Sequence, residues 1–124
     1  MNDILSNNIF NDVKRNLPIS EEDNSFDDEI LTYINSIFFD LNQIGLGPDE
    51  IFFVDQSKTW GDFSNIVGLL SAVREYIIIK VRIKFDPPSS SFVLSSYNEI
   101  ANKMEWRLNF YREDMLAKEK ENAK

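Results

Sequence analysis

The sequence predicts an all-α protein of about four helices around a small core, with one short extended or hairpin segment near residues 51–58. First, apolar residues recur at three- and four-residue steps along most of the chain. Second, Gly47-Pro48 and Pro87-Pro88 separate these stretches and are typical of helix ends. Third, 124 residues with 43% hydrophobic content suffice for one modest core. We expect one helical domain over residues 1–115 and a charged tail over residues 116–124.

The composition excludes several kinds of active site. The chain has no Cys and no His, which removes disulfides, thiol catalysis and the commonest zinc ligands. Residues 1–65 hold 3 basic and 13 acidic side chains, a net of −10, and residues 66–124 hold 10 and 8, a net of +2. Such an acidic surface favours solubility and disfavours a grip on DNA, which needs a basic footprint.

The N-terminus has neither the basic start nor the apolar run of a signal peptide. No apolar run approaches the ~20 residues that span a bilayer. We therefore expect a protein that is made and used in a cytosol and does not enter a membrane.

Two helices are expected in the first 45 residues. Residues 2–16 carry apolar side chains at helical spacing and are followed by Pro18. Ser25 and Asp28 then have the spacing of a capping box. The apolar face of this second helix consists of Ile30, Ile34, Ile37, Leu41 and Ile44. Gly45 is a natural stop for it.

The next stretch is mixed. Ile51 to Val54 is short and apolar, which indicates a brief extended piece and is compatible with half of a small hairpin. Thr59 and Asp62 repeat the capping-box spacing, so a helix is expected to begin near Trp60.

Residues 77–85 carry two competing signals. Apolar residues alternate with Lys80, Arg82 and Lys84, which is the period of a half-buried strand. Helical spacing from Ile66 nevertheless continues through Val81, and no Gly, Pro or Asn interrupts residues 69–85. The pattern favours a helix that is apolar on two sides, without excluding the strand.

Pro87 and Pro88 end this element. Ser90 or Ser91 is a suitable N-cap for a last helix from about Phe92 to near the terminus. Its apolar stripe is expected to be Ile100, Met104, Leu108, Tyr111 and Met115. Beyond Leu116 the chain is polar, so we expect a frayed or projecting tail unless another subunit orders it.

Two charged groups resemble ligand sites and have simpler explanations. The acids of residues 21–29 lack the spaced ligands and central Gly of an EF-hand loop, so helix capping and a solvated connector explain them better. Arg74, Lys80, Arg82 and Lys84 lack a stacking platform for nucleic acid. Such residues more often extend from a packed helix to solvent, or pair with carboxylates of another chain. No cofactor or metal is expected.

Apolar residues on the outer faces of helices are the more informative candidates. Trp106 and Phe110 lie four residues apart, away from the Met104/Leu108 stripe. Either a second core element or a subunit interface, where aromatics are enriched, would cover them. The full candidate set for an interface with other copies or with a partner protein is Phe39, Ile79, Ile83, Trp106, Phe110, Lys118 and Lys120.

Several short segments together resemble a known family. They are Ile34-Asn35-Ser36, Gly45-x-Gly47-Pro48, Thr59-Trp60, Lys80-Val81-Arg82, Phe85-Asp86-Pro87-Pro88 and Glu105-Trp106-Arg107-Leu108. In this order and spacing the chain resembles the head–tail connector, or adaptor, proteins of tailed phages and prophages of Gram-positive bacteria, over about residues 1–112. None of the segments is a catalytic motif, and the set is more specific than any member.

The resemblance implies a mostly helical, non-enzymatic subunit, usually twelve copies of which form a ring beneath the portal protein. The ring extends the channel for double-stranded DNA, which passes without specific binding, and its other face receives the next neck or tail component. The C-terminal helix and tail commonly engage the portal. The implied location is the neck of the virion, and the host cytoplasm during assembly. The resemblance also favours a helix at residues 77–85.

Two other functions were weighed. One is a small acidic binding module that acts on a basic host protein, which specific capture of a host protein by a monomer would favour. The other is a carboxylate-dependent hydrolase, which needs convergent carboxylates and a metal. The sequence offers no motif for the hydrolase.

Overall fold

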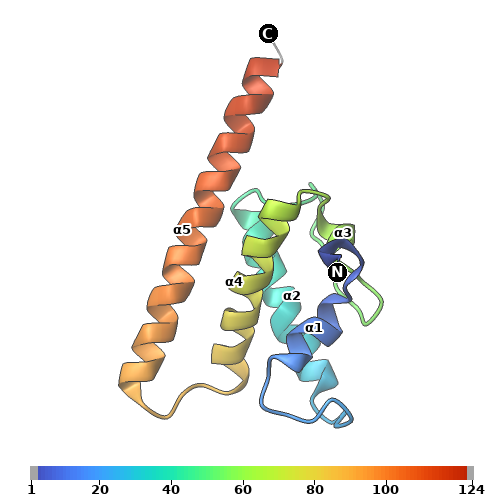
Figure 1. The fold of residues 1–124 in the computed structure, drawn as a ribbon, viewed down its shortest axis with the longest axis vertical. Coiled ribbons are helices and arrows are strands. Elements are labelled where there is room, and N and C mark those ends of the chain that lie inside the picture. Colours follow the sequence, from blue (N-terminus) through green and yellow to red (C-terminus); the bar gives the residue numbers. More distant parts are fainter. Residues whose placement is uncertain (1–2, 123–124) are drawn as a thin grey trace.

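The computed structural model describes residues 3–122 and is built from helices (Figure 1). A short 3-10 helix, η1, spans Ile4–Ser6 and is followed by α1 (Ile9–Arg15) and α2 (Asp27–Gln43). The single turn α3 spans Trp60–Phe63, α4 spans Val67–Phe85 and α5 spans Ser91–Asn122. No strand occurs between residues 3 and 122, so the all-α prediction is confirmed. Within that range, no helix has the length and apolar character to cross a bilayer.

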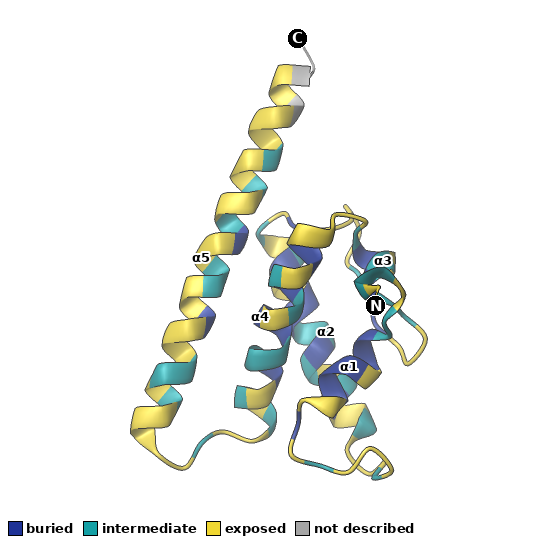
Figure 2. Cartoon of the chain, in the orientation of Figure 1, coloured by how far each residue is buried: buried dark blue, intermediate teal, exposed yellow. Residues whose placement is uncertain are grey.

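The core lies where α1, α2, α3 and α4 meet, and α5 packs on the outer side of α4 (Figures 1 and 2). Among its fully buried side chains are Ile9, Val13, Ile30, Ile34, Ile37, Leu41, Trp60, Leu69, Leu70, Val73, Ile77, Val81 and Leu108. Phe38 lies at the centre of an aromatic group, with ring centroids 5.1 Å from both Phe52 and Phe63. A single core therefore organises the described chain.

Residues 77–85 are helical and form the last turns of α4. The strand-like alternation was misleading because α4 packs against α2 on one side and α5 on the other. A helix covered on two sides carries apolar residues on both, and over a short stretch this imitates a period of two. Ile77 and Val81 are fully buried in the core, whereas Ile79 and Ile83 are half-buried.

The N-terminal segment is two helices rather than one. The chain turns at Asn7 and Asn8, and the Asn8 side chain caps α1 by accepting a hydrogen bond from the backbone N–H of Asn11. Asn8 also forms an isolated antiparallel bridge with Thr59. The predicted hairpin near residues 51–58 is absent, because residues 51–55 have no strand partner and are held by side chains instead.

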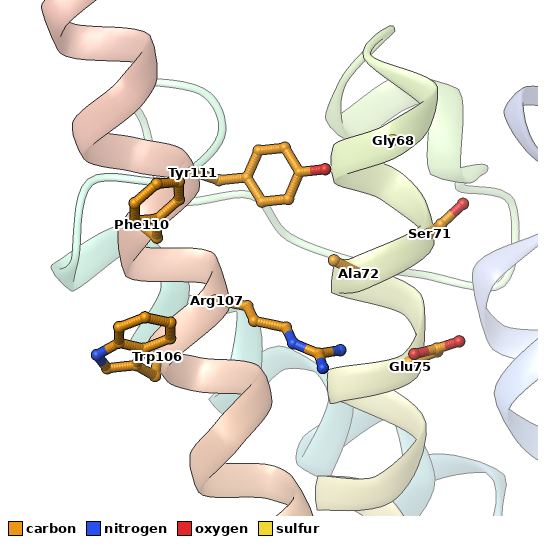
Figure 3. A pocket seen from close by; sticks show the side chains of 8 residues that line it. All are labelled: Gly68, Ser71, Ala72, Glu75, Trp106, Arg107, Phe110 and Tyr111. Carbon is orange, nitrogen blue, oxygen red and sulfur yellow. The ribbon is translucent and has the colours of Figure 1, made fainter.

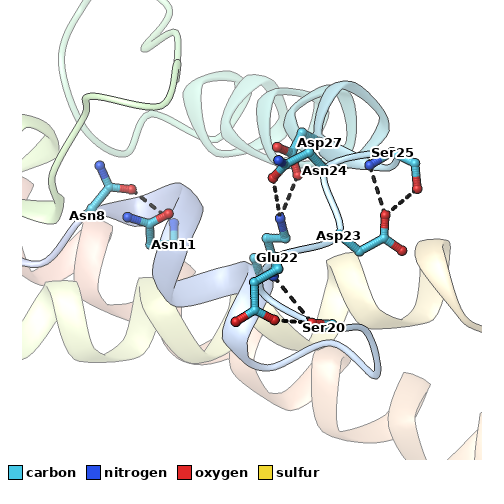
Figure 4. A network of polar contacts seen from close by, with 9 residues as sticks. Asn8, Asn11, Ser20, Glu22, Asp23, Asn24, Ser25 and Asp27 are labelled. Atoms are coloured by element: carbon cyan, nitrogen blue, oxygen red, sulfur yellow. Dashed lines mark hydrogen bonds and ion pairs between the residues drawn. The ribbon is translucent and has the colours of Figure 1, made fainter.

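The predicted capping box at Ser25 is wrong. Helix α2 begins at Asp27, and no side chain caps it. The Ser25 hydroxyl donates to Asp23 instead, while Asp27 accepts a hydrogen bond from Lys14 Nζ at 2.8 Å (Figure 4). The buried Lys14 ammonium needs that partner. A tertiary ion pair with α1 therefore holds the first residue of this helix.

The second capping box is confirmed. Thr59 and Asp62 cap α3 reciprocally, and the helix begins at Trp60 as predicted. It ends after one turn because Ser64 is extended, with φ −161° and ψ 155°, and α4 begins as a separate helix at Val67.

Glycine ends α2 as expected. Gly45 and Gly47 both have positive φ, 85° and 84°, a conformation that glycine adopts without steric cost. A Cβ on Gly47 would lie 2.3 Å from the ring of Phe63, so the turn also has no room for a side chain at this position. This turn carries the chain from α2 towards residues 51–55.

Helix α5 begins at Ser91, and the Ser90 hydroxyl accepts a hydrogen bond from the N–H of Val93, as expected of an N-cap. The predicted stripe is correct at Leu108, Met104 and Met115, which are buried in the core or pack against it, and wrong at Ile100 and Tyr111. Ala101 is buried, whereas Ile100 is 43% exposed. Tyr111 is also exposed, because α5 packs mainly on α4 and its contact face is narrow. The charged tail continues the helix to Asn122, and residues 123–124 of the expected tail lie outside the described range.

Candidate interaction surface

Trp106 and Phe110 form the largest exposed aromatic feature of α5. Their side chains are 70% and 62% exposed and stack with ring centroids 6.2 Å apart. They line one side of a groove of about 320 Å³ between α5 and α4 (Figure 3). Of the two explanations considered for this pair, coverage by a second core element is therefore wrong within the described chain.

The groove exists because small residues of α4 face large residues of α5. Gly68, Ser71 and Ala72 line its α4 side. A Cβ on Gly68 would lie 3.5 Å from the Tyr111 hydroxyl, which shows how closely that ring approaches α4. The groove is therefore a mainly apolar surface with polar side chains along one edge.

The other predicted interface residues come from separate parts of the fold. Phe39 lies on α2 and is 46% exposed. Ile79 and Ile83 are half-buried in the C-terminal half of α4. Lys118 and Lys120 lie on the last turns of α5, where Lys118 pairs with Asp114 at 3.2 Å. The structure brings Trp106 and Phe110 together and leaves the other five apart from them.

Sequence analysis missed two exposed residues on the segment that follows α2. Ile51 is 54% and Phe53 is 67% exposed, whereas Phe52 packs into the core cluster and Val54 is buried. The side chains thus alternate between core and solvent, as in an extended chain. A run of four apolar residues hides that alternation, so no signal in the sequence separates the outward pair from the inward pair.

The basic residues of α4 make contacts within the chain. Arg74 donates to both carboxylate oxygens of Asp12 from Nε and Nη2, at 2.6 and 2.9 Å. Lys80 lies over the ring of Tyr76 and Arg82 over that of Tyr97. The expectation that Arg74 pairs with another chain is therefore wrong, because Arg74 forms an ion pair with Asp12 within its own chain.

Asp12 is buried and joins three helices. Besides Arg74 of α4, the indole Nε1 of Trp60 in α3 donates to it at 3.0 Å. Burial would raise the pKa of Asp12, but the hydrogen bonds from Arg74 and Trp60 and the positive charge of Arg74 outweigh it and lower the pKa. The carboxylate stays charged and stabilises the fold.

The acidic connector before α2 is occupied by local hydrogen bonds. Figure 4 shows Glu22 with Ser20, Asp23 with Ser25, and Asn24 and Asp27 around the Lys14 ammonium. Within residues 3–122, no group of three or more acids is placed to hold a metal ion.

Several pockets are lined by two carboxylates, and one of them also holds a buried tyrosine. Asp40 and Glu105 line this pocket with Tyr76 and Lys80, where α2, α4 and α5 meet. Burial, with a smaller effect of Glu105 and Asp40, raises the pKa of Tyr76 to about 12. The phenol is therefore protonated at neutral pH and is no general base.

Comparison with known families decides between the remaining functions. A family model described as phage connector protein matches residues 9–115. The chain belongs to the phage connector protein family. The match runs from the start of α1 to Met115 of α5, which packs against the core. No curated protein and no solved structure matches the chain.

Membership of this family confirms the resemblance to head–tail connectors. The connector is a structural protein of a bacteriophage virion, and the family implies partners among portal and tail proteins and a place at the virion neck. Surfaces that contact other proteins are therefore the functional sites of this chain, and the exposed aromatics of α5 are the first candidates.

Proposed function

We propose that the connector forms a ring of twelve copies beneath the portal, extends the channel for double-stranded DNA and receives the next neck or tail component on its other face. The observation that carries this proposal is the stacked, solvent-exposed pair Trp106 and Phe110 on a chain of the connector family. Large aromatics on an otherwise polar helix face are typical of protein interfaces.

A ring also requires a second lateral surface on each copy. Phe39 on α2 and Ile51 and Phe53 on the segment that follows α2 supply exposed apolar side chains away from α5. Each copy thus has apolar surface for two neighbours.

The net charge of −8 suits a channel through which DNA moves. Phosphates bind where Lys and Arg neutralise them, and an excess of acids opposes that binding. We expect the DNA to pass without specific contacts.

The C-terminal end of α5 is the candidate contact with the portal. Figure 1 shows that α5 extends well past the N-terminal end of α4. Leu116 is 47% exposed there, and the Lys118 side chain is 70% exposed. A helix end without cover from its own subunit is available to a partner during assembly in the host cytoplasm, and afterwards in the virion.

The mass of the purified protein, alone and mixed with the portal protein of its own phage, tests the proposal. Native mass spectrometry or light scattering should show a portal complex that contains one connector per portal subunit. A protein that stays monomeric and never binds the portal would overturn the proposal. Specific capture of a host protein by that monomer would favour the alternative, a small acidic module that acts on the host.

Removal of residues 116–124 should separate folding from docking. We expect an unchanged thermal midpoint, because Met115 is retained and Leu116 lies 47% exposed outside the core. Portal affinity should fall on the order of 10-fold or more, as for loss of a helix end that makes interface contacts. Circular dichroism and portal co-sedimentation measure the two effects, and Glu21→Gln, whose side chain is 65% exposed between α1 and α2, serves as the full-length control. An unchanged yield of tailed particles from the truncated protein would contradict the assignment.

A further inference from the structure

The connector has a second exposed patch, on α2, whose charged side chains are acidic. An open depression on this side is lined by Phe53 and Asp55 of the segment after α2 and by α2 residues, which are Asp28, Leu31, Thr32 and Asn35. Phe39 lies one turn beyond Asn35 on the same face of α2, since residues 28, 32, 35 and 39 follow helical spacing. The α2 patch is defined here as Asp28, Phe39, Phe53 and Asp55.

Core contacts hold this patch in place. The Asn35 side chain accepts from the Val54 N–H at 2.7 Å and donates to the Val54 carbonyl at 3.0 Å. On the other side of Phe53, the ring of Phe52 packs between Phe38 and Phe63. Phe53 is therefore presented outward from a backbone that is fixed on both sides, so little conformational entropy is lost when a partner covers it.

The α2 patch carries a net negative charge. Hydrogen bonds from Ser57 lower the pKa of Asp55, and Lys58 adds a smaller effect, so Asp55 is ionised at neutral pH. Residues 49–55 contain three acids and no base. Lys58 is the neighbouring cation, and with Asp28 and Asp55 it leaves the patch net negative.

The α5 patch is defined as Lys103, Trp106, Arg107 and Phe110, and all four side chains are exposed. Lys103 lies one turn before Trp106, and Arg107 follows Trp106 on the groove side. Glu99 and Asp114 are exposed one turn before Lys103 and one turn after Phe110 on the same helix face, and Asp114 pairs with Lys118 at 3.2 Å. Glu75 lies across the groove on α4, and Glu105 lies in the pocket with Tyr76. Within the α5 patch itself, the charged side chains beside the aromatic rings are both cations.

The two patches lie on opposite sides of the core. The groove lies on the face of α4 that carries Gly68, Ser71 and Ala72, while the other face of α4 buries Leu69, Leu70 and Val73 in the core. Likewise, α2 buries Ile30, Ile34 and Ile37 and presents the Phe53 side outward. Since each patch lies on the face of its helix that points away from the buried residues, the two patches of one copy do not meet each other.

We propose that the α2 patch of one copy packs on the α5 patch of a second copy, with Phe39 and Phe53 against Trp106 and Phe110, and Asp28 and Asp55 facing Lys103 and Arg107. Two different, complementary patches on opposite sides make a head-to-tail interface and not a two-fold one, and such an interface gives a ring when the rotation between neighbouring copies closes. This inference rests on the proposed ring and identifies its lateral contact.

Cross-linking tests the contact in the connector assembled on its portal protein. The natural chain has no Cys, so Asp55→Cys and Lys103→Cys variants each carry one thiol. With a short bis-maleimide, the mixture of the two should give a covalent dimer, and each variant alone should give none. The matched control is Phe92→Cys, which is 79% exposed on α5 outside both patches and should not cross-link to Asp55→Cys.

Charge reversal tests the same contact without new thiols. Lys103→Glu with Arg107→Glu should weaken assembly on the order of 10-fold or more, because like charges would then face each other. Adding Asp28→Lys and Asp55→Lys to the same chain should restore assembly, which shows that the first pair did not unfold the protein.

The possible outcomes separate this inference from the proposed function. A connector that never binds the portal overturns both. A connector that assembles while the 55–103 cross-link is missing and charge rescue fails overturns the contact alone. Cross-linking of Lys103→Cys to itself would show a two-fold interface and also overturn it.

Discussion

Replacement of Asp12 by asparagine is expected to lower the free energy of unfolding by about 3 kcal/mol. The carboxylate accepts two hydrogen bonds from Arg74 and one from Trp60, and its residue is 6% exposed. Asparagine keeps the shape but offers one acceptor oxygen and no charge, so Arg74 loses its counter-ion and part of its fork geometry. Urea denaturation monitored by circular dichroism measures the loss.

The pH dependence of stability tests whether the charge of Asp12 accounts for the loss. The pKa of Asp12 is lowered in the fold, so its stabilisation is complete above the unfolded value of about 3.9 and is lost as pH falls through the lower folded value. The difference in the free energy of unfolding between wild type and Asp12→Asn should stay constant from neutral pH to about 5 and shrink below about 4. A difference that persists undiminished at pH 2 would show that charge is not its source.

A control separates this pair from ordinary surface charges. Arg15 and Glu21 approach to 3.5 Å with side chains 61% and 65% exposed. Exposed pairs of this kind contribute little because water screens them and ordering long side chains costs entropy. Glu21→Gln should therefore leave the unfolding midpoint unchanged.

Leu108→Ala is expected to destabilise the protein by about 3 kcal/mol and to loosen α5 from α4. Leu108 is fully buried, and among the α5 side chains that the structure describes the other buried one is the small Ala101. Removing the larger side chain leaves a cavity at the centre of the contact between these two helices. Hydrogen exchange should show faster exchange along α5, while the amides of α2 keep their protection against local opening.

Trp106→Ala is the matched control on the same helix. Its ring is 70% exposed, so it adds little to the stability of an isolated copy. We expect an unfolding midpoint within about 0.5 kcal/mol of wild type. Assembly on the portal should weaken on the order of 30-fold, as for an interface hot spot. If Leu108→Ala and Trp106→Ala lowered stability equally, the assignment of these two faces of α5 would be wrong.

The head–tail connector function could be predicted from short segments of sequence, although none carries catalysis. The candidate interface could be predicted in part. Trp106 and Phe110 depart from the apolar stripe of their own helix, and helical spacing is enough to detect that. Phe53 could not be found in this way, because each of its neighbours at residues 51–54 is also apolar and any of them could have faced the core.

The sequence by itself determined the large helices, the stops at Gly45 and Pro87, and the cap at Thr59. These features depend on hydrogen bonds and steric limits within a few residues, which local residue types decide. The start of α2 did not follow from the local capping pattern. Its first residue, Asp27, pairs instead with the ammonium of Lys14 on α1.

Tertiary structure alone decided which apolar faces are covered and how Asp12 is used. The bonds from Asp12 to Trp60 and Arg74 span 48 and 62 residues, so no local pattern announces them. The strand-like signal at residues 77–85 gave way to a helix because α2 and α5 cover α4 on two sides. Burial depends on which elements meet in space, and periodicity describes one element at a time.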